Sequence, residues 1–367
     1  MQALHDLCKL LIRPLITLRK KTLHLILSLI RVRPFGAMKG QFMSLDVIYV
    51  GNAIVDMVAR CVDAFLSDHE IDKGGMNLID EDRAIYLSEH LPNPTVMSGG
   101  SAANSAVGMA LLGGKSGYVG EVAQDELGRE FIHSLRQTGT EFLGKETNDG
   151  LATARSMIVV TPDAIRSMNT FLGACIQMGP HHLEDMPDCD VYYLEGYLFD
   201  APQGPALFEQ VAQTAAKTGA KLALSLSDAW CVERHFDALS QFIKDHVSIL
   251  FSNEDEAKAL TGKSYQEAGQ ELSTYIDEVI ITRGAQGAFI LKDGEEADVA
   301  AAPVGAVVDT TGAGDLFAAG YLYGRSQNYD ARHCGLIASA LSGEIICHYG
   351  ACPEADLKAL IETVIAS

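Results

Sequence analysis

The chain has 367 residues, of which 48% are hydrophobic and 21% are charged, and its formal net charge is −20. This length is sufficient for one large globular domain with an appendage. The negative charge argues against nonspecific binding to nucleic acid, because a polyanion would be repelled by most of the surface. The eight cysteines form no C-x-x-C pair and have no regular spacing. They therefore indicate scattered thiols in a reducing cytoplasm rather than a zinc site or a disulfide framework.

Residues 1–43 differ from the rest of the chain, because they carry eight Lys or Arg residues and one acidic residue. Their apolar stretch at 10–32 is interrupted by five basic residues, so it predicts no membrane span. We favour a dispensable extension or a start assigned too early. An organelle-targeting presequence and a basic amphipathic helix at a membrane surface are the alternatives. The main domain is thus predicted at 44–367, and membrane contact is expected only through 1–43.

From residue 45 onward, short apolar runs alternate with helix-like segments such as 206–217 and 254–260. This alternation predicts an α/β fold with a mostly parallel sheet covered on both faces. In such sheets, ligands bind at the carboxyl ends of the strands. Two stretches, 53–77 and 154–170, alternate differently, and the second has no evident crossover helix. The strand candidates of the main sheet are 47–50, 117–119, 191–194, 222–226, 248–251, 279–282 and 288–291.

The first glycine-rich motif is Ser-Gly-Gly-Ser-Ala-Ala-Asn at 98–104, followed by small and apolar residues that suit a packed helix. Gly99 and Gly100 would permit close approach of a substrate to the backbone. Asn104 has both donor and acceptor groups and would hold a hydroxyl. Upstream, Asp56 ends a Gly-Asn-x-x-x-Asp segment. A fixed carboxylate there can accept hydrogen bonds from two adjacent hydroxyls of a sugar.

The second motif, Asp-Thr-Thr-Gly-Ala-Gly-Asp at 309–315, runs directly into an apolar, helix-compatible stretch. The N–H groups of Gly312, Ala313 and Gly314, together with the start of a helix, would attract an anion. Asp315 stands beside this cradle and could take the proton from an attacking hydroxyl. A cradle and a base are the minimum equipment for phosphoryl transfer to an alcohol.

These two motifs resemble the two signature regions of the ribokinase-like (PfkB) family of carbohydrate and nucleoside kinases. The resemblance extends from about residue 45 to the end and implies a three-layer sandwich with a small β-sheet lid, which 53–77 and 154–170 would form. Shorter segments at 51–56, 249–257 and 350–354 resemble the adenosine-phosphorylating members. The expected reaction is therefore ATP-dependent phosphorylation of the adenosine 5′-hydroxyl. A sugar kinase acting on ribose, fructose or a keto-deoxy sugar acid is the alternative.

The resemblance also implies roles for residues outside the two motifs. Arg166 would reach the transferring phosphate from the lid, since a guanidinium matches phosphate geometry. Glu256 would hold Mg²⁺ through water, because this ion keeps much of its hydration shell. A monovalent cation such as K⁺ and a monomer or homodimer are further expectations. The residues expected to bind ATP are Asn253, Thr282, Gly284, Gly287 and Thr310.

Two aromatic residues, Tyr197 and Phe199, are the candidates for stacking on a purine, although core packing is the usual role of such residues. The chain lacks the G-x-x-x-x-G-K-[ST] phosphate loop and the H-R-D and D-F-G motifs. This excludes the P-loop and protein-kinase classes. A non-catalytic nucleoside- or sugar-binding protein of the same fold is the alternative from another class. The presence of Asp315 and its small-residue cradle argues against it.

Overall fold

The computed structural model describes residues 44–163 and 165–365. The basic segment 1–43, for which we expect a dispensable extension or a targeting role, lies outside the described residues. Within the described residues, no helix is both long and apolar enough to span a membrane.

The main sheet of the described chain has nine strands in the order β16-β15-β14-β13-β12-β11-β1-β5-β7. All neighbours from β7 to β14 pair in parallel, whereas β15 and β16 are antiparallel additions at one edge. Each strand candidate of the sequence analysis coincides with one of these strands. The bounds are β1 (Leu45–Val50), β5 (Ser116–Val119), β7 (Glu141–Phe142), β11 (Cys189–Glu195), β12 (Lys221–Ser225), β13 (Ile249–Asn253), β14 (Glu278–Thr282), β15 (Ala288–Lys292) and β16 (Glu295–Val299).

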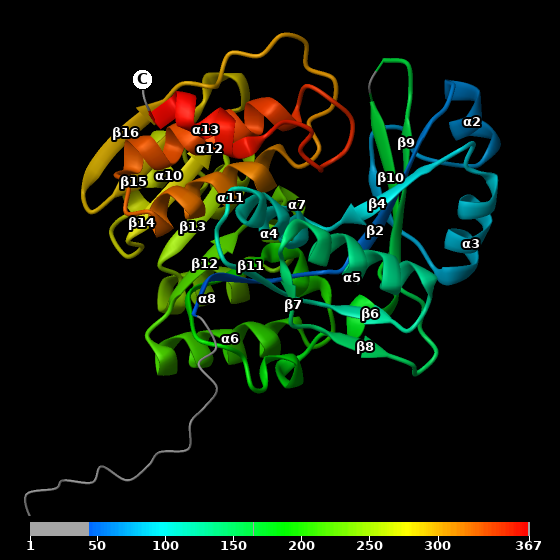
Figure 1. Cartoon of the computed structure of the whole chain (residues 1–367), viewed down its shortest axis with the longest axis horizontal. Helices are drawn as coiled ribbons and strands as arrows, with labels where there is room; N and C mark the ends of the chain where they lie inside the picture. Colours follow the sequence, from blue (N-terminus) through cyan, green and yellow to red (C-terminus); the bar gives the residue numbers. More distant parts are fainter. Residues whose placement is uncertain (1–43, 164, 366–367) are drawn as a thin grey trace, which may run out of the picture. The chain divides into compact units, whose positions relative to one another are not determined.

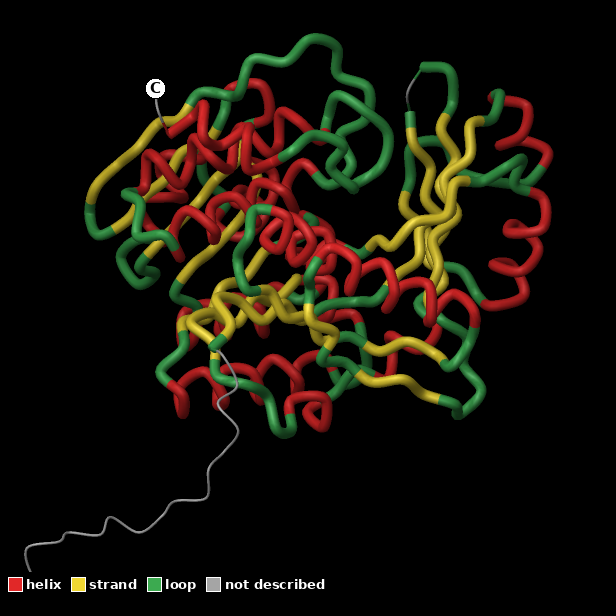
Figure 2. The backbone as a smooth tube through the Cα atoms, in the orientation of Figure 1, coloured by secondary structure: helices red, strands yellow, loops and turns green. Residues whose placement is uncertain are grey.

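Helices cover both faces of this sheet, which makes the three-layer sandwich that was expected (Figure 2). Alternate residues of one strand serve opposite cores: Ile48 packs in one cluster, and Tyr49 packs in the other. The first cluster includes residues of α6 (Gly204–Thr218), α8 (Phe236–His246), α9 (Glu254–Thr261) and α10 (Tyr265–Leu272). The second includes residues of α4 (Ser101–Leu111), α5 (Glu126–Thr138), α11 (Ala313–Ser326) and α12 (Ala331–Ile345), and α13 (Leu357–Ile365) packs outside them.

A second, smaller sheet stands apart from the main one in Figure 1 and has the order β3-β10-β9-β2-β4. Its core against two short helices includes Met157 and Val159, and the alternating residues Ser156 and Ile158 line a cavity instead. The strand β4 was not expected from the sequence. The bounds are β2 (Ile54–Arg60), α2 (Asp63–Asp68), β3 (Met76–Leu78), α3 (Glu81–His90), β4 (Thr95–Gly99), β9 (Ala154–Val160) and β10 (Arg166–Phe171).

Short elements complete the described fold, and several connecting loops lie at the carboxyl edge of the main sheet. A parallel pair joins β6 (Glu121–Ala123) to β8 (Lys145–Thr147). The helix α7 (Ala229–Arg234) follows β12, α9 follows β13, and α11 begins at the same edge. Short 3₁₀ turns are η1 (Gly173–Gln177), η2 (Pro180–Leu183), η3 (Gly196–Asp200) and η4 (Gly284–Gln286). The crossovers of a parallel sheet thus gather loops from distant parts of the chain at one place.

Candidate active site

A cavity of about 410 Å³ lies between the carboxyl edge of the main sheet and the small sheet. Its walls combine polar groups with apolar side chains such as Ile54, Leu172 and Phe251. Twelve residues to which the sequence analysis gave a role line it together. These are Asp56, Gly100, Asn104, Arg166, Tyr197, Asn253, Glu256, Thr282, Thr310, Gly312, Gly314 and Asp315.

The second glycine-rich motif forms the start of α11 at the cavity wall. Gly312 caps the helix with a φ of 75°, a left-handed conformation that favours glycine, and a Cβ there would lie 2.8 Å from Cβ of Ala351. Gly312 and Gly314 both line the cavity. Ala313 does not, and its N–H donates to the Thr310 carbonyl at 3.3 Å. The first turn of α11 therefore presents its positive dipole end to the cavity, mainly through the two glycines.

Asp315 is held by side chains of α4, which packs directly against α11. Its Oδ1 accepts a hydrogen bond from Ser101 Oγ at 2.7 Å, and its Oδ2 accepts one from Asn104 Nδ2 at 2.8 Å. Ser105 Oγ also donates to its backbone carbonyl at 3.0 Å. Burial raises the pKa of Asp315, and the bonds from Asn104 and Ser101 oppose this rise. Asn104, which we expected to bind a substrate hydroxyl, thus positions the carboxylate of Asp315.

Asp56 projects into the same cavity from β2. Burial raises its pKa to about 7, the Arg166 guanidinium lowers it, and the carboxylates of Asp315 and Asp309 raise it further. Gly99 does not line the cavity. A Cβ at Gly99 would lie 2.2 Å from Asp56 Oδ2, so the glycine makes room for this carboxylate. Gly100 has a φ of 90° and caps α4 at the cavity wall.

Arg166, on β10 of the small sheet, forms an ion pair with Asp309 of the second glycine-rich motif. Its Nη1 lies 2.6 Å from Asp309 Oδ1, and the Asp309 side chain is only 3% exposed. Asp309 also accepts hydrogen bonds from the N–H and hydroxyl of Thr311 and from Gly350 N–H. Burial raises the pKa of Asp309, but these bonds and Arg166 bring it below its ordinary value. No role was predicted for Asp309, because its partner Arg166 lies 143 positions away in the chain and leaves no local signal.

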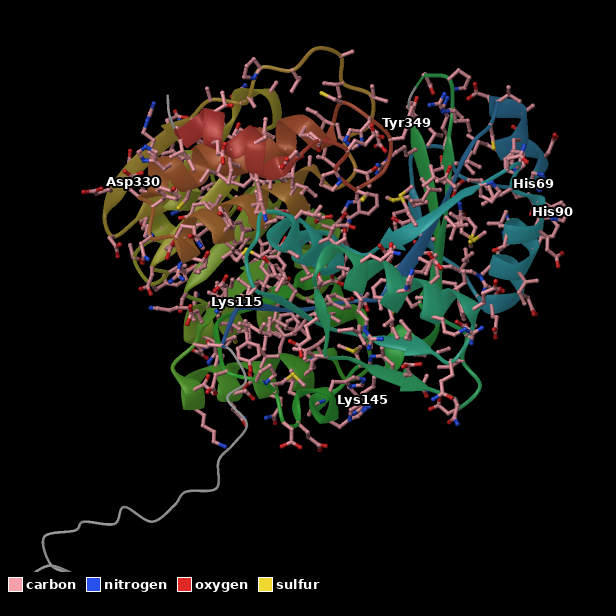
Figure 3. The ribbon with its side chains drawn as sticks, in the orientation of Figure 1. His69, His90, Lys115, Lys145, Asp330 and Tyr349 are labelled. Carbon is pink, nitrogen blue, oxygen red and sulfur yellow. The ribbon has the colours of Figure 1, made fainter. Side chains whose placement is uncertain are left out.

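A second contact joins the small sheet to the C-terminal part of the chain. The guanidinium of Arg60, at the end of β2, lies 4.0 Å from the ring centroid of Tyr349. Figure 3 shows Tyr349 where the C-terminal part of the chain faces the small sheet. A cation–π contact of this kind contributes about 0.5–1 kcal/mol at an exposed site. The small sheet is therefore attached to the 309–350 region at two points.

The predicted nucleotide residues fall into two groups. Asn253 and Glu256 form a reciprocal cap of α9: Glu256 N–H donates to Asn253 Oδ1, and the Glu256 carboxylate accepts from Asn253 N–H and Nδ2. Burial raises the pKa of Glu256 to about 7. Gly284 and Gly287 have φ angles of 52° and 85° in the turn between β14 and β15, and they do not line the cavity. They provide the turn geometry, whereas Thr282 at the end of β14 does line the cavity.

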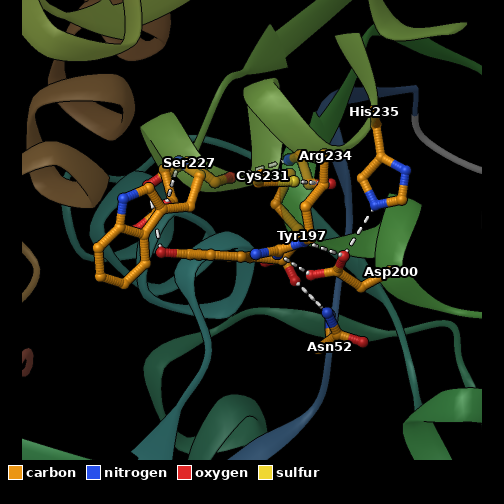
Figure 4. A network of polar contacts seen from close by, with 11 residues as sticks. Asn52, Tyr197, Asp200, Ser227, Cys231, Arg234 and His235 are labelled. Carbon is orange, nitrogen blue, oxygen red and sulfur yellow. Dashed lines mark hydrogen bonds and ion pairs between the residues drawn. The ribbon is translucent and has the colours of Figure 1, made fainter. Parts of the chain in front are cut away.

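The two aromatic candidates have different surroundings. Tyr197 lines the cavity, and its hydroxyl donates to the Ser227 carbonyl at 3.2 Å (Figure 4). Phe199 is 4% exposed and packs edge-on against Phe208, with ring centroids 4.3 Å apart, in the core below the sheet. The stacking role predicted for Phe199 is therefore wrong, because its ring is buried in the core and packs against Phe208.

Glu195 and Asn52 line the cavity but had no predicted role. Glu195 Oε1 accepts from the Asn52 N–H and Nδ2, both at 2.8 Å, and Oε2 accepts from Ala102 N–H at 2.8 Å. Burial raises the pKa of Glu195 to about 7, and these hydrogen bonds oppose the rise. The side chain ties the end of β11 to the β1–β2 connection and to the start of α4. The signal in the sequence was a glutamate directly after the apolar run at 191–194, a place where a charged side chain is seldom buried without a partner.

Comparison with known proteins shows what the whole chain is similar to. A model described as pfkB family carbohydrate kinase matches residues 76–357. Adenosine kinase from Saccharomyces cerevisiae is 24% identical over 313 residues, which cover 78% of this chain and 91% of that protein. The crystal structure of a probable sugar kinase from Rhizobium etli is 40% identical, with a TM-score of 0.81, and the match covers 87% of this chain and 98% of that one. The crystal structure of adenosine kinase from Sinorhizobium meliloti is 39% identical, with a TM-score of 0.81, and the match covers 87% and 99%.

Proposed function

Because the chain belongs to the pfkB family of carbohydrate kinases, we propose that it transfers the γ-phosphoryl group of ATP to the 5′-hydroxyl of adenosine and forms AMP. The observation that carries this proposal is the position of Asp315. Its carboxylate is held by two donors, at 2.7 and 2.8 Å, beside the glycine-rich start of α11 and in a cavity. A fixed carboxylate next to an anion-binding helix start is suited to transfer of a phosphoryl group to a hydroxyl.

In the proposed reaction, Asp315 accepts the proton of the 5′-hydroxyl while the oxygen of that hydroxyl forms a bond to the γ-phosphorus. The bond from that phosphorus to the leaving oxygen of ADP breaks in the same step. The N–H groups of Gly312 and Gly314 stabilise the negative charge on the transferring group. Asp56 accepts hydrogen bonds from the ribose hydroxyls. Arg166 exchanges its bond with Asp309 for one with the phosphates, which would bring the small sheet down as a lid and exclude water.

The residues around Glu256 fit a water-mediated site for Mg²⁺. Each carboxylate oxygen of Glu256 accepts one hydrogen bond from Asn253, so each retains a lone pair for a water ligand. Mg²⁺ prefers to keep several waters, which matches such a sparse site. When bound with ATP, the ion would neutralise phosphate charge. A requirement for K⁺ remains a prediction, which assays in K⁺ and Na⁺ salts can test.

The apolar part of the cavity favours a nucleoside over a bare sugar. Leu172, Phe251 and Phe317 line it together with Tyr197, and burial of a purine against such groups contributes a few kcal/mol. The yeast and Sinorhizobium relatives, both named adenosine kinases, support this choice. The Rhizobium relative, named a probable sugar kinase, and the loss of Phe199 as a stacking group favour the sugar alternative. Both substrates would use the same base.

A substrate panel decides between the two. The purified protein is assayed with ATP and Mg²⁺ on adenosine, 2′-deoxyadenosine, ribose, fructose and a keto-deoxy sugar acid. Adenosine should have the highest kcat/KM. Its 2′-deoxy analogue should react less well, because Asp56 would lose a hydrogen-bond partner while remaining desolvated. A higher kcat/KM for ribose, fructose or the sugar acid than for adenosine would establish the sugar-kinase alternative and leave the role of Asp315 intact.

A further inference from the structure

Two groups of three side chains in the described chain have the composition of a metal site. One residue of the first group, Asp200, lines the active-site cavity, and no residue of the second group does. The first consists of Asp200, Cys231 and His235. Figure 4 shows that Asp200 is already paired: His235 Nε2 lies 2.8 Å from its Oδ1, and Arg234 donates to both of its oxygens, at 3.2 and 2.7 Å. The Cys231 thiol donates to the Gly196 carbonyl at 3.3 Å. An arginine occupies the place of a cation in this group, so it needs no metal.

The second group consists of Glu121, His181 and His182, whose ligand atoms all lie within 4.8 Å of one another. Glu121 begins β6, and the two histidines lie on η2, about 60 residues further along the chain. The side chains of His182 and Glu121 are 0% and 6% exposed, whereas His181 is exposed. Two buried polar groups of this kind require partners.

Glu121 and His182 lie at ion-pair distance, but their relative orientation gives no hydrogen bond between them. His182 Nε2 lies 2.9 Å from Glu121 Oε2, yet neither atom has a hydrogen-bond partner. The other ring nitrogen of His182, Nδ1, lies 3.2 Å from both the N–H and the carbonyl of Gly179. When Nδ1 accepts from the N–H, Nε2 carries the proton that faces Glu121. When Nδ1 donates to the carbonyl instead, the lone pair of Nε2 points toward the carboxylate. A cation between the two atoms removes the repulsion, and a backbone bond at the far nitrogen is the usual support of a metal-binding histidine.

The surroundings of this group suit a positive ion. Glu121 and His181 line a separate cavity of about 560 Å³, and its other charged residues are Glu146, Asp149 and Lys145. Three acidic residues thus face one lysine there. The ammonium of Lys145 is already bound to the His181 carbonyl at 2.7 Å, and Figure 3 shows Lys145 at the lower edge of the molecule. The cavity gives an ion an entry path and gives water a coordination position.

We propose that Glu121, His181 and His182 form a binding site for a borderline divalent metal ion, with Zn²⁺ as its best occupant. Two imidazole nitrogens and one carboxylate oxygen, with water in the fourth position, are a ligand set that Zn²⁺ favours, whereas Mg²⁺ and Ca²⁺ prefer oxygen ligands. Bond lengths of about 2.0–2.1 Å in a tetrahedron separate ligand atoms by about 3.3 Å. The pair at 2.9 Å therefore has to open by only a few tenths of an ångström. The cysteine spacing predicted no zinc site, and this site contains no cysteine.

A bound ion would connect β6 to η2 and would stabilise the fold without taking part in phosphoryl transfer. The site shares no lining residue with the active-site cavity. Its effect should therefore appear in thermal unfolding rather than in turnover. A ligand that binds only the folded state raises the unfolding temperature in proportion to the logarithm of its concentration.

The experiment uses the full chain after treatment with a chelator. Zn²⁺ binding is measured by titration calorimetry, and Co²⁺ is added as a spectroscopic substitute whose visible absorption reports a four-coordinate site. The wild type should bind one equivalent and unfold at a higher temperature with Zn²⁺. The test variants are His181→Ala, at an exposed position where folding is not at risk, and Glu121→Gln. The matched controls are His133→Ala, at an exposed histidine of α5, and His235→Gln, which removes a member of the first group.

His181→Ala and Glu121→Gln should weaken Zn²⁺ binding by at least about tenfold, since even loss of a supporting residue costs about 10–100-fold. Both should also remove the Co²⁺ absorption, and the controls should change neither. Three results would overturn the proposal. The first is absence of Zn²⁺ binding by the wild type, which would mean that Glu121 and His182 share a proton, and the second is unchanged Zn²⁺ binding in His181→Ala. The third is a Co²⁺ spectrum with a thiolate band that His235→Gln abolishes, which would place the ion in the first group. The result for Glu121→Gln is interpreted only if circular dichroism shows that this variant folds. If it does not fold, His181→Ala alone is the deciding variant.

Discussion

Replacement of Asp315 by asparagine tests the proposed base without disturbing its surroundings. Asp315 accepts from Ser101 Oγ at 2.7 Å and from Asn104 Nδ2 at 2.8 Å. An asparagine of the same shape can keep its oxygen toward Asn104 and turn its amide toward the Ser101 hydroxyl, which accepts as well as donates. The substitution also removes the cost of burying a carboxylate. Asp315→Asn should therefore fold and should be at least as stable as the wild type.

The effect of Asp315→Asn should appear in the chemical step. Loss of a general base lowers turnover by about 10²–10⁴, which corresponds to about 2.7–5.4 kcal/mol of transition-state stabilisation. The affinity for ATP should change little, because the hydrogen bonds of Asn253, Thr282 and Glu256 do not involve the Asp315 carboxylate. The measurements are kcat and kcat/KM at saturating ATP, the Kd of ATP by calorimetry, and the unfolding temperature.

The matched control for Asp315→Asn is Ser101→Ala, which keeps the base and removes one of its two donors. Burial already raises the pKa of Asp315, and the Ser101 bond opposes that rise. Ser101→Ala should therefore move the acidic limb of the pH–rate profile to higher pH and cost much less turnover at alkaline pH. Wild-type turnover in Asp315→Asn would refute the assignment. Equal losses in the two variants at all pH values would show that geometry, rather than proton transfer, is what the carboxylate supplies.

Two further predictions concern the packing around the base. Gly99→Ala should destabilise the fold by about 1–3 kcal/mol in urea unfolding and should weaken nucleoside binding, because its Cβ would lie 2.2 Å from Asp56 Oδ2. The control is Gly305→Ala, whose Cβ would meet nothing within 4 Å. Equal effects of the two substitutions would contradict this explanation. Asp309→Asn should cost about 1–3 kcal/mol at pH 7. The pKa of Asp309 is depressed below 3.8, so its stabilisation is present above that pH and is lost as the pH falls through the folded-state pKa. The difference in the free energy of unfolding between wild type and Asp309→Asn should therefore shrink below about pH 4. A difference that persists at lower pH would show that the charge of Asp309, and thus its ion pair with Arg166, is not the source of the stabilisation.

The sequence alone determined the features that depend on near neighbours in the chain. Apolar runs alternating with helical segments predicted the parallel sheet, and each predicted strand is found within the fold. The two glycine-rich motifs predicted where helices begin near a ligand, and Gly100 and Gly312 have the positive φ angles, 90° and 75°, that such starts require. These properties follow from local backbone conformation and periodicity, which a few consecutive residues set.

Only the tertiary structure decided which side chains meet. Asp315 receives its hydrogen bond from Ser101 across 214 positions of sequence, and the partner of Asn104 proved to be this carboxylate. Phe199 lies in the core, whereas Tyr197, two residues earlier, reaches the cavity. His182 of η2 faces Glu121 of β6 although the two residues are far apart in the chain. Such pairings depend on how crossover connections bring distant strands and loops to one place, and no local pattern of residues encodes that geometry.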